Sequence, residues 1–364
     1  MKILHIIIGS ANAGGVGSVV YNYMKHIDQD KYHFDFALLG CKPGMIGKEM
    51  VKLGAHCYEL PLKSIDIQGY KKQLYEILTS EGYDAIHVHE NSTSFVALRV
   101  AKKAGVKCRI AHAHTAFQPN SFKSWLKVIT GRFLNYIFAT KLIGCGQKAG
   151  EYVFGKSHMK SSKALVLPNA IEAKHFQYNE RIRNEVRYEL NLGGKYTIGM
   201  IGRFSTQKNH AFALPMIHSL YQRMHDFVLV MVGTGELEVE VKKYCKENDM
   251  EEYTQFLGVR KDMTRVYQAL DVCILPSLWE GFPVVGLEAI ASGLPLILSD
   301  KITPELFFSS NVSYQPLNET KWVEILQQKP MNNHREAGYE EIKMNGFDIH
   351  DTMELLEKAY DEAK

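Results

Sequence analysis

The sequence predicts an α/β protein made of two Rossmann-like domains, each with a doubly wound parallel sheet. Short β-rich runs alternate with helical patterns along the chain, which is typical of parallel sheets covered by helices. The alternation pauses near residue 170 and then restarts. The chain of 364 residues is also too long for a single compact core. These three observations together predict two domains.

The first domain is predicted from seven strand-like runs with helical patterns between several of them. The strands are expected at 2–8, 33–39, 55–60, 85–89, 108–114, 141–145 and 164–168. The helices are expected at 18–27, 69–80, 92–104 and 121–139. A polar, irregular segment from Pro168 has the character of a connector. It closes an expected first domain of residues 1–170.

The second domain repeats the alternation. Its strands are expected at 197–202, 227–233, 254–258, 272–276 and 294–299, and its helices near 209–224, 236–248, 262–269 and 284–292. We assign residues 171–345 to this domain. The remaining residues 346–364 form an amphipathic helix with no strand after it, so we expect this helix to pack back on the first domain.

Composition limits the class of function. Hydrophobic residues make up 46% and charged residues 23%, which is ordinary for a globular protein, and a formal charge of +3 gives no global argument for nucleic acid binding. Six cysteines without a CxxC pair favour neither a disulfide framework nor a zinc knuckle, and they fit the cytoplasm. The N-terminal run MKILHIIIGS predicts a strand rather than a signal peptide, and no apolar run is long enough to span a bilayer.

Ligands of doubly wound sheets bind at the carboxyl ends of the strands, so the loops there are the first candidates. After the first strand, Gly14, Gly15 and Gly17 allow a close backbone approach ahead of a helix. The loop is not a dinucleotide fingerprint, because Val20 stands where the last glycine would be needed and no acidic residue follows the second strand. A tight turn without a ligand remains the alternative.

The loop RFSTQKN after the run TIGMIG holds two cations, Arg203 and Lys208, just before a helix. A guanidinium, an ammonium and the free amides of a helix N-terminus suit a diphosphate. A solvated loop is the alternative for this pair taken alone.

The loop SLWEGFPVVGLEAIASG carries two glutamates. Pro283 is expected at the first position of a helix and Gly293 at its C-terminal cap, so the free amides after Pro283 point toward a ligand. Glu280 precedes this helix and Glu288 lies within it. Carboxylates accept hydrogen bonds from paired hydroxyls, which makes ribose and hexose natural partners.

The segments GRFSTQKN, VGTGE, FLGV and EGFPVVGLEAIASGLPLI resemble the nucleotide-sugar half of the retaining GT-B glycosyltransferases of family 4, with the E-x7-E signature intact. GGVGS, AHAHT and LPNAIEAKHF are similar to the first domain and connector of the same family, of the capsular or exopolysaccharide type. The resemblance implies a GT-B fold, in which two Rossmann-like domains face one another across a cleft.

The resemblance also implies roles for individual residues. Arg203 and Lys208 would bind the donor diphosphate, Glu288 the ribose, and Glu280 the donor sugar, while His114 would lie by the anomeric centre. As catalytic residues we therefore expect His114, Arg203, Lys208 and Glu280. Further donor contacts are expected from the backbone around Gly14, Gly15, Thr234, Gly235, Gly258, Val259, Phe282, Pro283, Val284 and Val285.

The chemistry that the resemblance implies is transfer with retention, in which the acceptor attacks on the face from which the diphosphate leaves. Fixed cations and amides stabilise the leaving charge, so neither a metal nor another cofactor is expected. The histidine pairs His87/His89 and His112/His114 share strand faces, as zinc ligands do, but packing and hydrogen bonding also gather histidines there. Asp28-Gln29-Asp30 spells a DxD motif within an expected turn.

Residues 100–164 contain twelve Lys and Arg residues against one acid, Glu151. Within this stretch, apolar residues recur at helical spacing around Lys123, Trp125, Lys127 and Arg132. We expect these four residues to face an anionic membrane surface. A core helix with a solvated cationic side is the alternative.

These features together predict a cytoplasmic retaining transferase, peripheral at the inner face of the plasma membrane. The resemblance implies that it moves a hexose from a nucleotide diphosphate sugar, with UDP favoured, to a glycan or polyprenyl-diphosphate-linked glycan in bacterial surface polysaccharide synthesis. A nucleotide-sugar 2-epimerase of the same architecture and a non-enzymatic nucleotide-sugar binding protein are the alternatives. We expect no nucleic acid partner.

Overall fold

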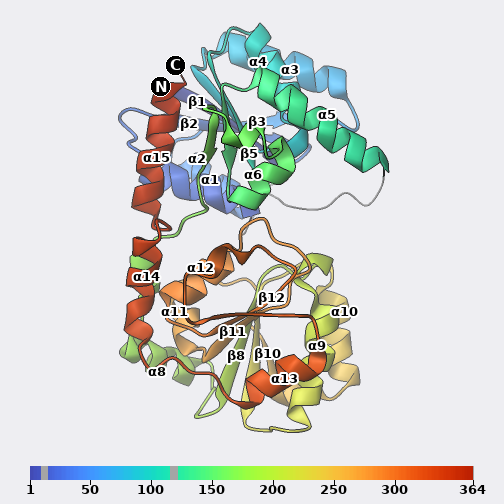
Figure 1. The fold of residues 1–364 in the computed structure, drawn as a ribbon, viewed down its shortest axis with the longest axis vertical. Helices are drawn as coiled ribbons and strands as arrows, with labels where there is room; N and C mark the ends of the chain where they lie inside the picture. The colour runs from blue at the N-terminus through green and yellow to red at the C-terminus, as the bar shows by residue number, and fades with distance from the viewer. Residues whose placement is uncertain (10–14, 115–121, 364) are drawn as a thin grey trace. The chain divides into compact units, whose positions relative to one another are not determined.

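The computed structural model describes residues 1–9, 15–114 and 122–363. The chain divides into two compact units (Figure 1). Unit 1 comprises Met1–Ala170 and Ile349–Lys364, and unit 2 comprises Ile171–Asp348. Relative to the ranges expected from the sequence, this division assigns residues 346–348 to unit 2.

Unit 1 is built on a seven-stranded parallel sheet of order β3-β2-β1-β4-β5-β6-β7. The strands are β1 (Lys2–Ile8), β2 (His33–Leu39), β3 (Cys57–Leu60), β4 (Ala85–Val88), β5 (Cys108–Ala113), β6 (Lys141–Gly144) and β7 (Ala164–Val166). The order reverses between β1 and β4, which makes the carboxyl ends of these two strands the expected ligand position.

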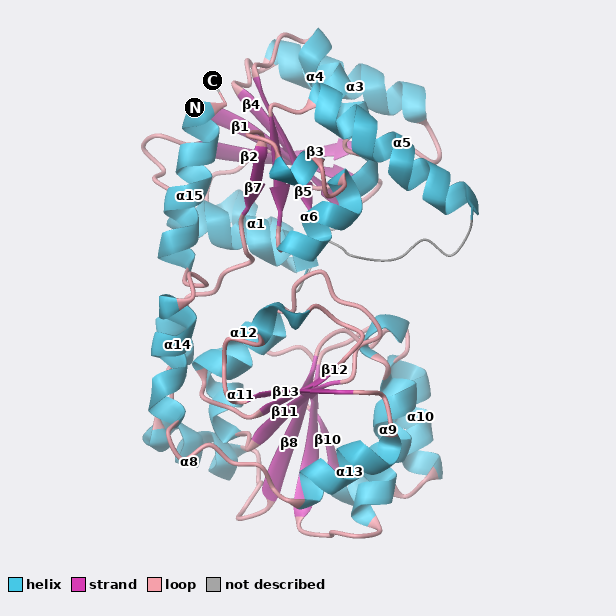
Figure 2. Ribbon diagram, in the orientation of Figure 1, coloured by secondary structure: helices cyan, strands magenta, loops and turns pink. Residues whose placement is uncertain are grey.

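Helices cover both faces of this sheet (Figure 2). They are α1 (Gly15–His26), α2 (Met45–Lys52), α3 (Ile67–Ser80), α4 (Phe95–Lys103), α5 (Phe122–Phe138), α6 (Gln147–Phe154) and α15 (Ile349–Glu362). One buried core joins the sheet to α1, α2 and α15, and a second joins the opposite face to α3, α4 and α6. The prediction of a doubly wound sheet is therefore confirmed.

The C-terminal helix α15 packs on unit 1, as predicted. Its buried side chains Ile349, Met353, Leu356 and Tyr360 recur three to four residues apart and join the core that contains α1. The helix thus brings the last residues of the chain against the same sheet face as the first helix.

Unit 2 contains a six-stranded parallel sheet of order β10-β9-β8-β11-β12-β13. The strands are β8 (Tyr196–Ile201), β9 (Phe227–Val232), β10 (Thr254–Phe256), β11 (Val272–Leu275), β12 (Leu296–Ser299) and β13 (Val312–Gln315). The order reverses between β8 and β11. The last strand was not predicted, because all four of its residues are only partly buried and the run is not apolar.

The helices of unit 2 are α7 (Ala173–Phe176), α8 (Glu180–Glu189), α9 (His210–Tyr221), α10 (Glu238–Glu247), α11 (Met263–Ala269), α12 (Val284–Ala291), α13 (Glu319–Gln327) and α14 (Gly338–Met344). The predicted connector is more structured than expected, since Asn179 caps α8 by accepting from the amide of Ile182. Among the described residues, no helix is both long and apolar enough to cross a bilayer.

Candidate active site

Two loops meet at the point where the strand order of unit 2 reverses. One follows β8 and carries Arg203 and Lys208, and the other follows β11 and carries Glu280. The Nζ atom of Lys208 lies 2.7 Å from Oε1 of Glu280. Both side chains are largely buried, with 13% and 9% exposed. Two residues predicted for different parts of a nucleotide-sugar therefore form one ion pair.

The Glu280 carboxylate is held by several donors. Its Oε1 also accepts from the Ser277 hydroxyl at 2.9 Å, and its Oε2 accepts from the Gln207 amide at 2.9 Å. Gln207 further donates to the Trp279 carbonyl at 2.9 Å, which ties the two loops together. The carboxylate is thus fixed before any ligand arrives. Ser277 and Gln207 were not predicted from the sequence.

Lys208 reaches Glu280 because its side chain passes over a glycine. Gly202 has φ +147°, and a Cβ placed there would lie 2.8 Å from Cε of Lys208, so the lysine stem passes directly over this glycine. Gly233, with φ +137°, approaches more closely still, because its Cβ would lie 2.0 Å from the carbonyl oxygen of Gly202. At this point the loops after β8 and β9 therefore touch through backbone atoms. Neither glycine was singled out from the sequence.

Arg203 is arranged differently from Lys208. Its side chain is 73% exposed, and its guanidinium lies 3.0 Å from the Glu236 carboxylate, which is itself 52% exposed. Exposed ion pairs of this kind contribute little stability. The guanidinium is therefore inexpensive to redirect toward an anionic ligand.

Glu288 projects from α12 and is partly buried. Its Oε2 accepts from the hydroxyl of Tyr267 on α11 at 2.7 Å. Burial raises the pKa of Glu288 to about 7, opposed by this hydrogen bond and by the charge of Lys208. Burial, followed by the charge of Glu288, also raises the pKa of the nearby Cys273 thiol to about 12. The Glu288 carboxyl therefore changes its charge near neutral pH.

The start of α12 differs in one respect from the prediction. The helix begins at Val284, and Pro283 is its N-cap rather than its first helical residue. Because proline has no N–H, the amides of Val284 and Val285 are the donors at this helix end. The ring of Phe282 packs against Phe347, with centroids 5.3 Å apart. Gly293 follows the helix with φ +64°, as expected for a C-terminal cap.

The expected base-framing residues lie in the loops after β9 and β10. The hydroxyl of Thr234 donates to Glu238 at 2.6 Å. A Cβ on Gly235 would lie 2.3 Å from the Phe204 carbonyl oxygen, so this glycine packs against the loop after β8. The amide of Gly233 donates to the Gly258 carbonyl at 2.9 Å, and Val259 is 47% exposed. The loops after β8, β9 and β10 thus form one connected rim.

In unit 1 the expected residues follow β1 and β5. Gly14 lies outside the described residues, and Gly15 begins α1 with φ +66°. His114 follows β5, and its backbone N–H donates to the Asn91 side chain at 2.8 Å. Burial lowers the pKa of His114 to about 3, so the ring is neutral at physiological pH. Asn91, which was not predicted, itself adopts φ +52°.

Five histidines gather on one face of the unit 1 sheet. His5 is in register with His87 across β1 and β4, and His89, His112 and His114 continue the row. Two triplets offer nitrogen atoms within 4.8 Å of one another, which is close enough for a metal. Neighbouring rings already share nitrogen contacts of 2.7 to 3.0 Å, which are hydrogen-bond distances. The nitrogen spacing therefore fits a hydrogen-bonded row of rings.

The Asp28-Gln29-Asp30 motif lies in the turn after α1. The Asp28 carboxylate accepts from the Asp30 amide at 3.1 Å and lies 3.0 Å from Nζ of Lys31. The first aspartate is thus engaged in local turn contacts.

Helix α5 exposes apolar residues that recur at helical spacing. Trp125, Leu126, Ile129, Phe133 and Ile137 are 37% to 61% exposed. The side chain of Lys123 lies outside the described part of the chain, and Lys127 is exposed. The alternative of a core helix therefore fails for these apolar residues, whereas Val128 and Asn135 form the buried side.

Some of the cations of residues 100–164 have partners within unit 1. Arg132 donates from Nε and Nη2 to the Tyr152 carbonyl at 3.1 and 2.9 Å. Arg109 donates to the carbonyls of Val106, Lys107 and Phe138, and Lys141 pairs with Glu362 at 2.6 Å. These three charges therefore take part in the packing of unit 1.

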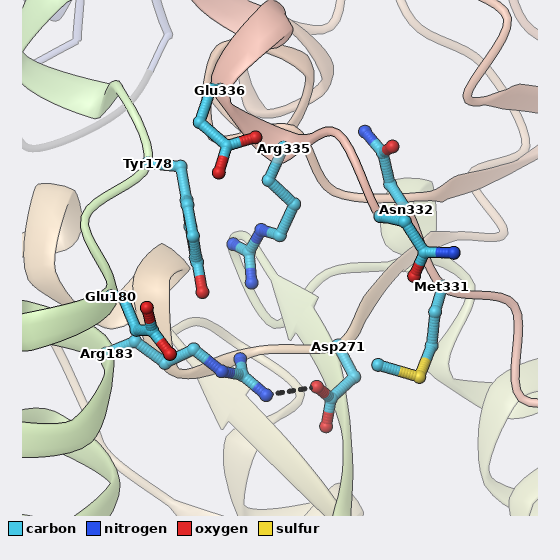
Figure 3. Close-up of a pocket in the computed structure, with 9 residues that line it drawn as sticks. Tyr178, Glu180, Arg183, Asp271, Met331, Asn332, Arg335 and Glu336 are labelled. Carbon is cyan, nitrogen blue, oxygen red and sulfur yellow. Dashed lines mark hydrogen bonds and ion pairs between the residues drawn. The ribbon is translucent and has the colours of Figure 1, made fainter.

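A separate cavity of about 250 Å³ lies at the opposite, amino end of the unit 2 strands (Figure 3). Figure 3 shows Arg183 directed at Asp271, and Arg335 over the ring of Tyr178. Arg335 also donates to three carbonyls, those of Ser292, Leu270 and Tyr267. Because both guanidinium groups already have protein partners, we assign this cavity no ligand.

Two parallel doubly wound sheets, with the polar loops at the reversal of the second one, define a GT-B fold. Solved structures agree: Anabaena HepE in complex with UDP superposes with a TM-score of 0.82 at 16% identity, covering all of both chains. Sucrose-phosphate synthase of Thermosynechococcus elongatus gives 0.76 at 16%, covering 99% of this chain and 98% of that one.

Sequence comparisons identify the family. A family model described as Glycosyltransferase Family 4 matches residues 13–175, and one described as Glycosyl transferases group 1 matches residues 195–321. EpsF of Bacillus subtilis, which carries a glycosyltransferase name, is 32% identical over 311 residues, covering 84% of this chain and 80% of EpsF. The chain therefore belongs to this glycosyltransferase family.

A second relative is the Escherichia coli UDP-Gal:alpha-D-GlcNAc-diphosphoundecaprenol alpha-1,3-galactosyltransferase. It is 31% identical over 240 residues, which are 62% of this chain and 60% of that relative.

Proposed function

We propose that this glycosyltransferase moves a hexose, with retention and without a metal, from a UDP-sugar to a polyprenyl-diphosphate-linked glycan in bacterial surface polysaccharide synthesis. The observation that carries the proposal is the Lys208–Glu280 pair at the strand reversal of unit 2, with Glu288 on the adjoining helix. The UDP complex of HepE supports the donor, and the name of the E. coli relative supports the acceptor.

The donor is divided among these side chains. Lys208, the exposed guanidinium of Arg203 and the amides of Val284 and Val285 oppose the diphosphate. Glu280 accepts from sugar hydroxyls and Glu288 from the ribose hydroxyls. The rim formed by Thr234, Gly235, Gly258 and Val259 frames the base. Gly14 and Gly15 of unit 1 contribute backbone to the phosphate.

Catalysis rests on stabilising the leaving group. As the bond between the sugar and the phosphate breaks, negative charge develops on the diphosphate, and fixed cations and amides stabilise it without reorganisation. The acceptor hydroxyl attacks the anomeric carbon from the face that the phosphate leaves and passes its proton to a phosphate oxygen. The neutral His114 ring lies by the anomeric centre. Because the chain's own cations would neutralise the diphosphate, we expect the reaction to proceed in EDTA.

Nucleotide binding should depend on pH through Glu288. Since its pKa is about 7, the carboxyl is mostly protonated at pH 6 and mostly ionised at pH 8. An ionised carboxylate accepts from both ribose hydroxyls, so UDP should bind about tenfold more tightly at pH 8 than at pH 6. Calorimetric titration at several pH values measures this.

The variant Glu288→Gln isolates the contribution of Glu288 to the pH dependence of UDP binding. Protonation of the UDP diphosphate itself affects the wild type and the variant equally. The ratio of wild-type to variant affinity should rise with pH, whereas Glu247→Gln on α10 should follow the wild type. The same raised pKa means that the folded state holds a proton which the unfolded state releases between pH 4.5 and 7. Stability should therefore fall as pH rises through this window, and less so in Glu288→Gln. A pH-independent affinity ratio would remove Glu288 from the ribose site.

A lipid-linked acceptor also requires a membrane surface, and we assign its contact to α5. The exposed apolar residues of this helix offer a shallow anchor, with Trp125 at a position that favours a membrane interface. Lys127 and Lys123 add attraction to anionic lipid, at about 1 kcal/mol for each cation near the surface. Arg132 contributes less than the sequence suggested, since its guanidinium is bound to the Tyr152 carbonyl. The enzyme would thus act at the cytoplasmic face.

Binding to liposomes tests this contact. Wild-type protein should bind more as anionic lipid increases and less as salt increases. The double variant Leu126→Ser/Phe133→Ser should lose about tenfold or more in affinity, because each side chain loses apolar burial in the lipid. Val239→Ser, which alters an 80% exposed apolar residue of unit 2, is the matched control. Equal liposome binding by the double variant and the control would contradict the assignment of the membrane contact to α5.

A further inference from the structure

The five clustered histidines of the unit 1 sheet, His5, His87, His89, His112 and His114, form one continuous chain of polar contacts with Tyr360 of α15. His112 Nδ1 lies 3.0 Å from His87 Nε2, and His87 Nδ1 lies 2.8 Å from the Tyr360 hydroxyl. The hydroxyl lies 3.5 Å from His5 Nε2, which is the longest link. His5 Nδ1 then lies 3.0 Å from His89 Nε2, and His89 Nδ1 lies 2.7 Å from His114 Nε2.

All five rings are neutral, because burial is the leading cause that lowers the pKa of each of them. A neutral imidazole carries one N–H donor and one acceptor nitrogen. Every link of the chain therefore needs a donor on one side and an acceptor on the other. Only two arrangements satisfy all links: either every ring carries its proton on Nδ1, or every ring carries it on Nε2.

The far end of the chain favours one arrangement. His112 Nε2 is buried and has no hydrogen-bond partner within the described ranges. With all protons on Nδ1, this atom is an unpartnered acceptor, whereas with all protons on Nε2 it is an unpartnered N–H. Among buried backbone groups, an orphaned N–H is rarer than an under-satisfied acceptor, and we apply the same preference to this ring nitrogen. Switching between the two arrangements would require a proton to reach the buried Nε2 atom of His112. We therefore expect the protons to stay on the Nδ1 atoms.

We propose that this chain of hydrogen bonds, which ends at the unpartnered Nε2 atom of His112 and runs through the Tyr360 hydroxyl, holds His114 in the Nδ1–H tautomer. His114 then presents a fixed hydrogen-bond donor at the carboxyl end of β5. The inference rests on the proposed function in one respect, that the oxygen this donor meets belongs to the sugar substrate. His5, His87, His89, His112 and Tyr360 are positioning residues, since they act on His114 without touching substrate.

This control of the His114 tautomer also gives the C-terminal helix a role in the site. Tyr360 is fully buried on α15, and its hydroxyl joins the His87–His112 pair to the His5–His89–His114 row. Removing that oxygen divides the chain into two independent pieces. The piece that contains His114 is then no longer connected to His112 and takes either tautomer.

Tautomers are measured directly by NMR on protein labelled with 15N-histidine, since the cross-peak pattern of the ring protons differs between Nδ1–H and Nε2–H. In the wild type we expect five rings with the Nδ1–H pattern and no ring protonation at neutral pH. This readout needs no activity, so it stands even if the proposed transfer reaction is wrong. A wild-type spectrum with the Nε2–H pattern on these rings would overturn the inference.

Tyr360→Phe should keep the ring packing, mix the tautomers of His5, His89 and His114, and lower kcat about tenfold, as for the loss of one hydrogen bond. The KM for the UDP-sugar should change little. Tyr23→Phe is the matched control, because Tyr23 is equally buried in the same core and its hydroxyl has no hydrogen-bond partner among the described residues. Identical spectra and kcat values for Tyr360→Phe and Tyr23→Phe would contradict the proposed control of the His114 tautomer. A shift in the ring signals of all five histidines on addition of one equivalent of Zn²⁺ would contradict it as well.

Discussion

Lys208→Ala is expected to weaken UDP binding about 10- to 150-fold. The ammonium makes a charge-assisted contact, whose loss costs about 1.5 to 3 kcal/mol. The largely buried Glu280 carboxylate would also keep its two neutral donors, Gln207 and Ser277, while losing its cation, so its charge would oppose the incoming diphosphate. Calorimetric titration with UDP measures the loss.

Three further variants separate the parts of the site. Arg203→Ala should weaken UDP binding as well, because its exposed guanidinium is drawn to the same diphosphate. Glu280→Ala should leave UDP binding intact or tighter, since it frees Lys208, but should impair binding of the UDP-sugar. Lys242→Ala on α10, which removes an exposed pair with Glu238, is the control. If Lys208→Ala binds UDP as well as Lys242→Ala does, the diphosphate assignment fails.

Gly233→Ala is expected to destabilise unit 2 by roughly 3 kcal/mol or more. Its φ of +137° disfavours a side chain, and the added Cβ would meet the Gly202 carbonyl oxygen at 2.0 Å. Because the obstacle is backbone, the loops after β8 and β9 must separate. Separation would also displace Lys208, which crosses Gly202.

Urea unfolding together with UDP titration tests this expectation. Gly194→Ala is the matched control, since Gly194 lies in the same unit and nothing stands within 4 Å of its added Cβ. The control should stay within about 0.5 kcal/mol of the wild type. Equal urea unfolding midpoints for Gly233→Ala and Gly194→Ala would mean that the close approach of the two loops does not contribute to the stability of unit 2.

Apart from β13, the strands of both sheets could be predicted, because most of them are short, buried apolar runs. Helices were predictable where a broad apolar stripe is present, as in α9, which buries six residues. Helix α8 was missed because Val186 is its one buried residue, so no apolar period marks it. Its structure depends instead on the Asn179 cap and on tertiary contacts such as Arg183 with Asp271.

The loops of the site were predictable from motifs, whereas their pairings were not. Lys208 and Glu280 are 72 residues apart, and only the adjacency of β8 and β11 brings them together. The approach of Gly233 to Gly202 likewise depends on neighbouring strand ends.

The histidine chain shows the same limit. The alternation in HVHE and HAHT predicted shared strand faces, but His5 joins them only because β1 lies beside β4. Tyr360 joins them only because α15 returns to that face of the sheet. Local pattern therefore predicts elements and loop chemistry, while strand order decides which side chains meet.

The central claim is that the chain transfers a hexose from a nucleotide diphosphate sugar with retention. The most direct test follows anomeric protons by NMR while the full chain is incubated with a UDP-hexose, a polyprenyl-diphosphate-linked sugar acceptor and EDTA. We predict an acceptor-dependent glycosidic product with the donor's anomeric configuration, and no product with Lys208→Ala at the same donor concentration. Inversion at C2 without acceptor, an inverted product, or donor binding with no transfer from any UDP-, GDP- or ADP-sugar would contradict the account.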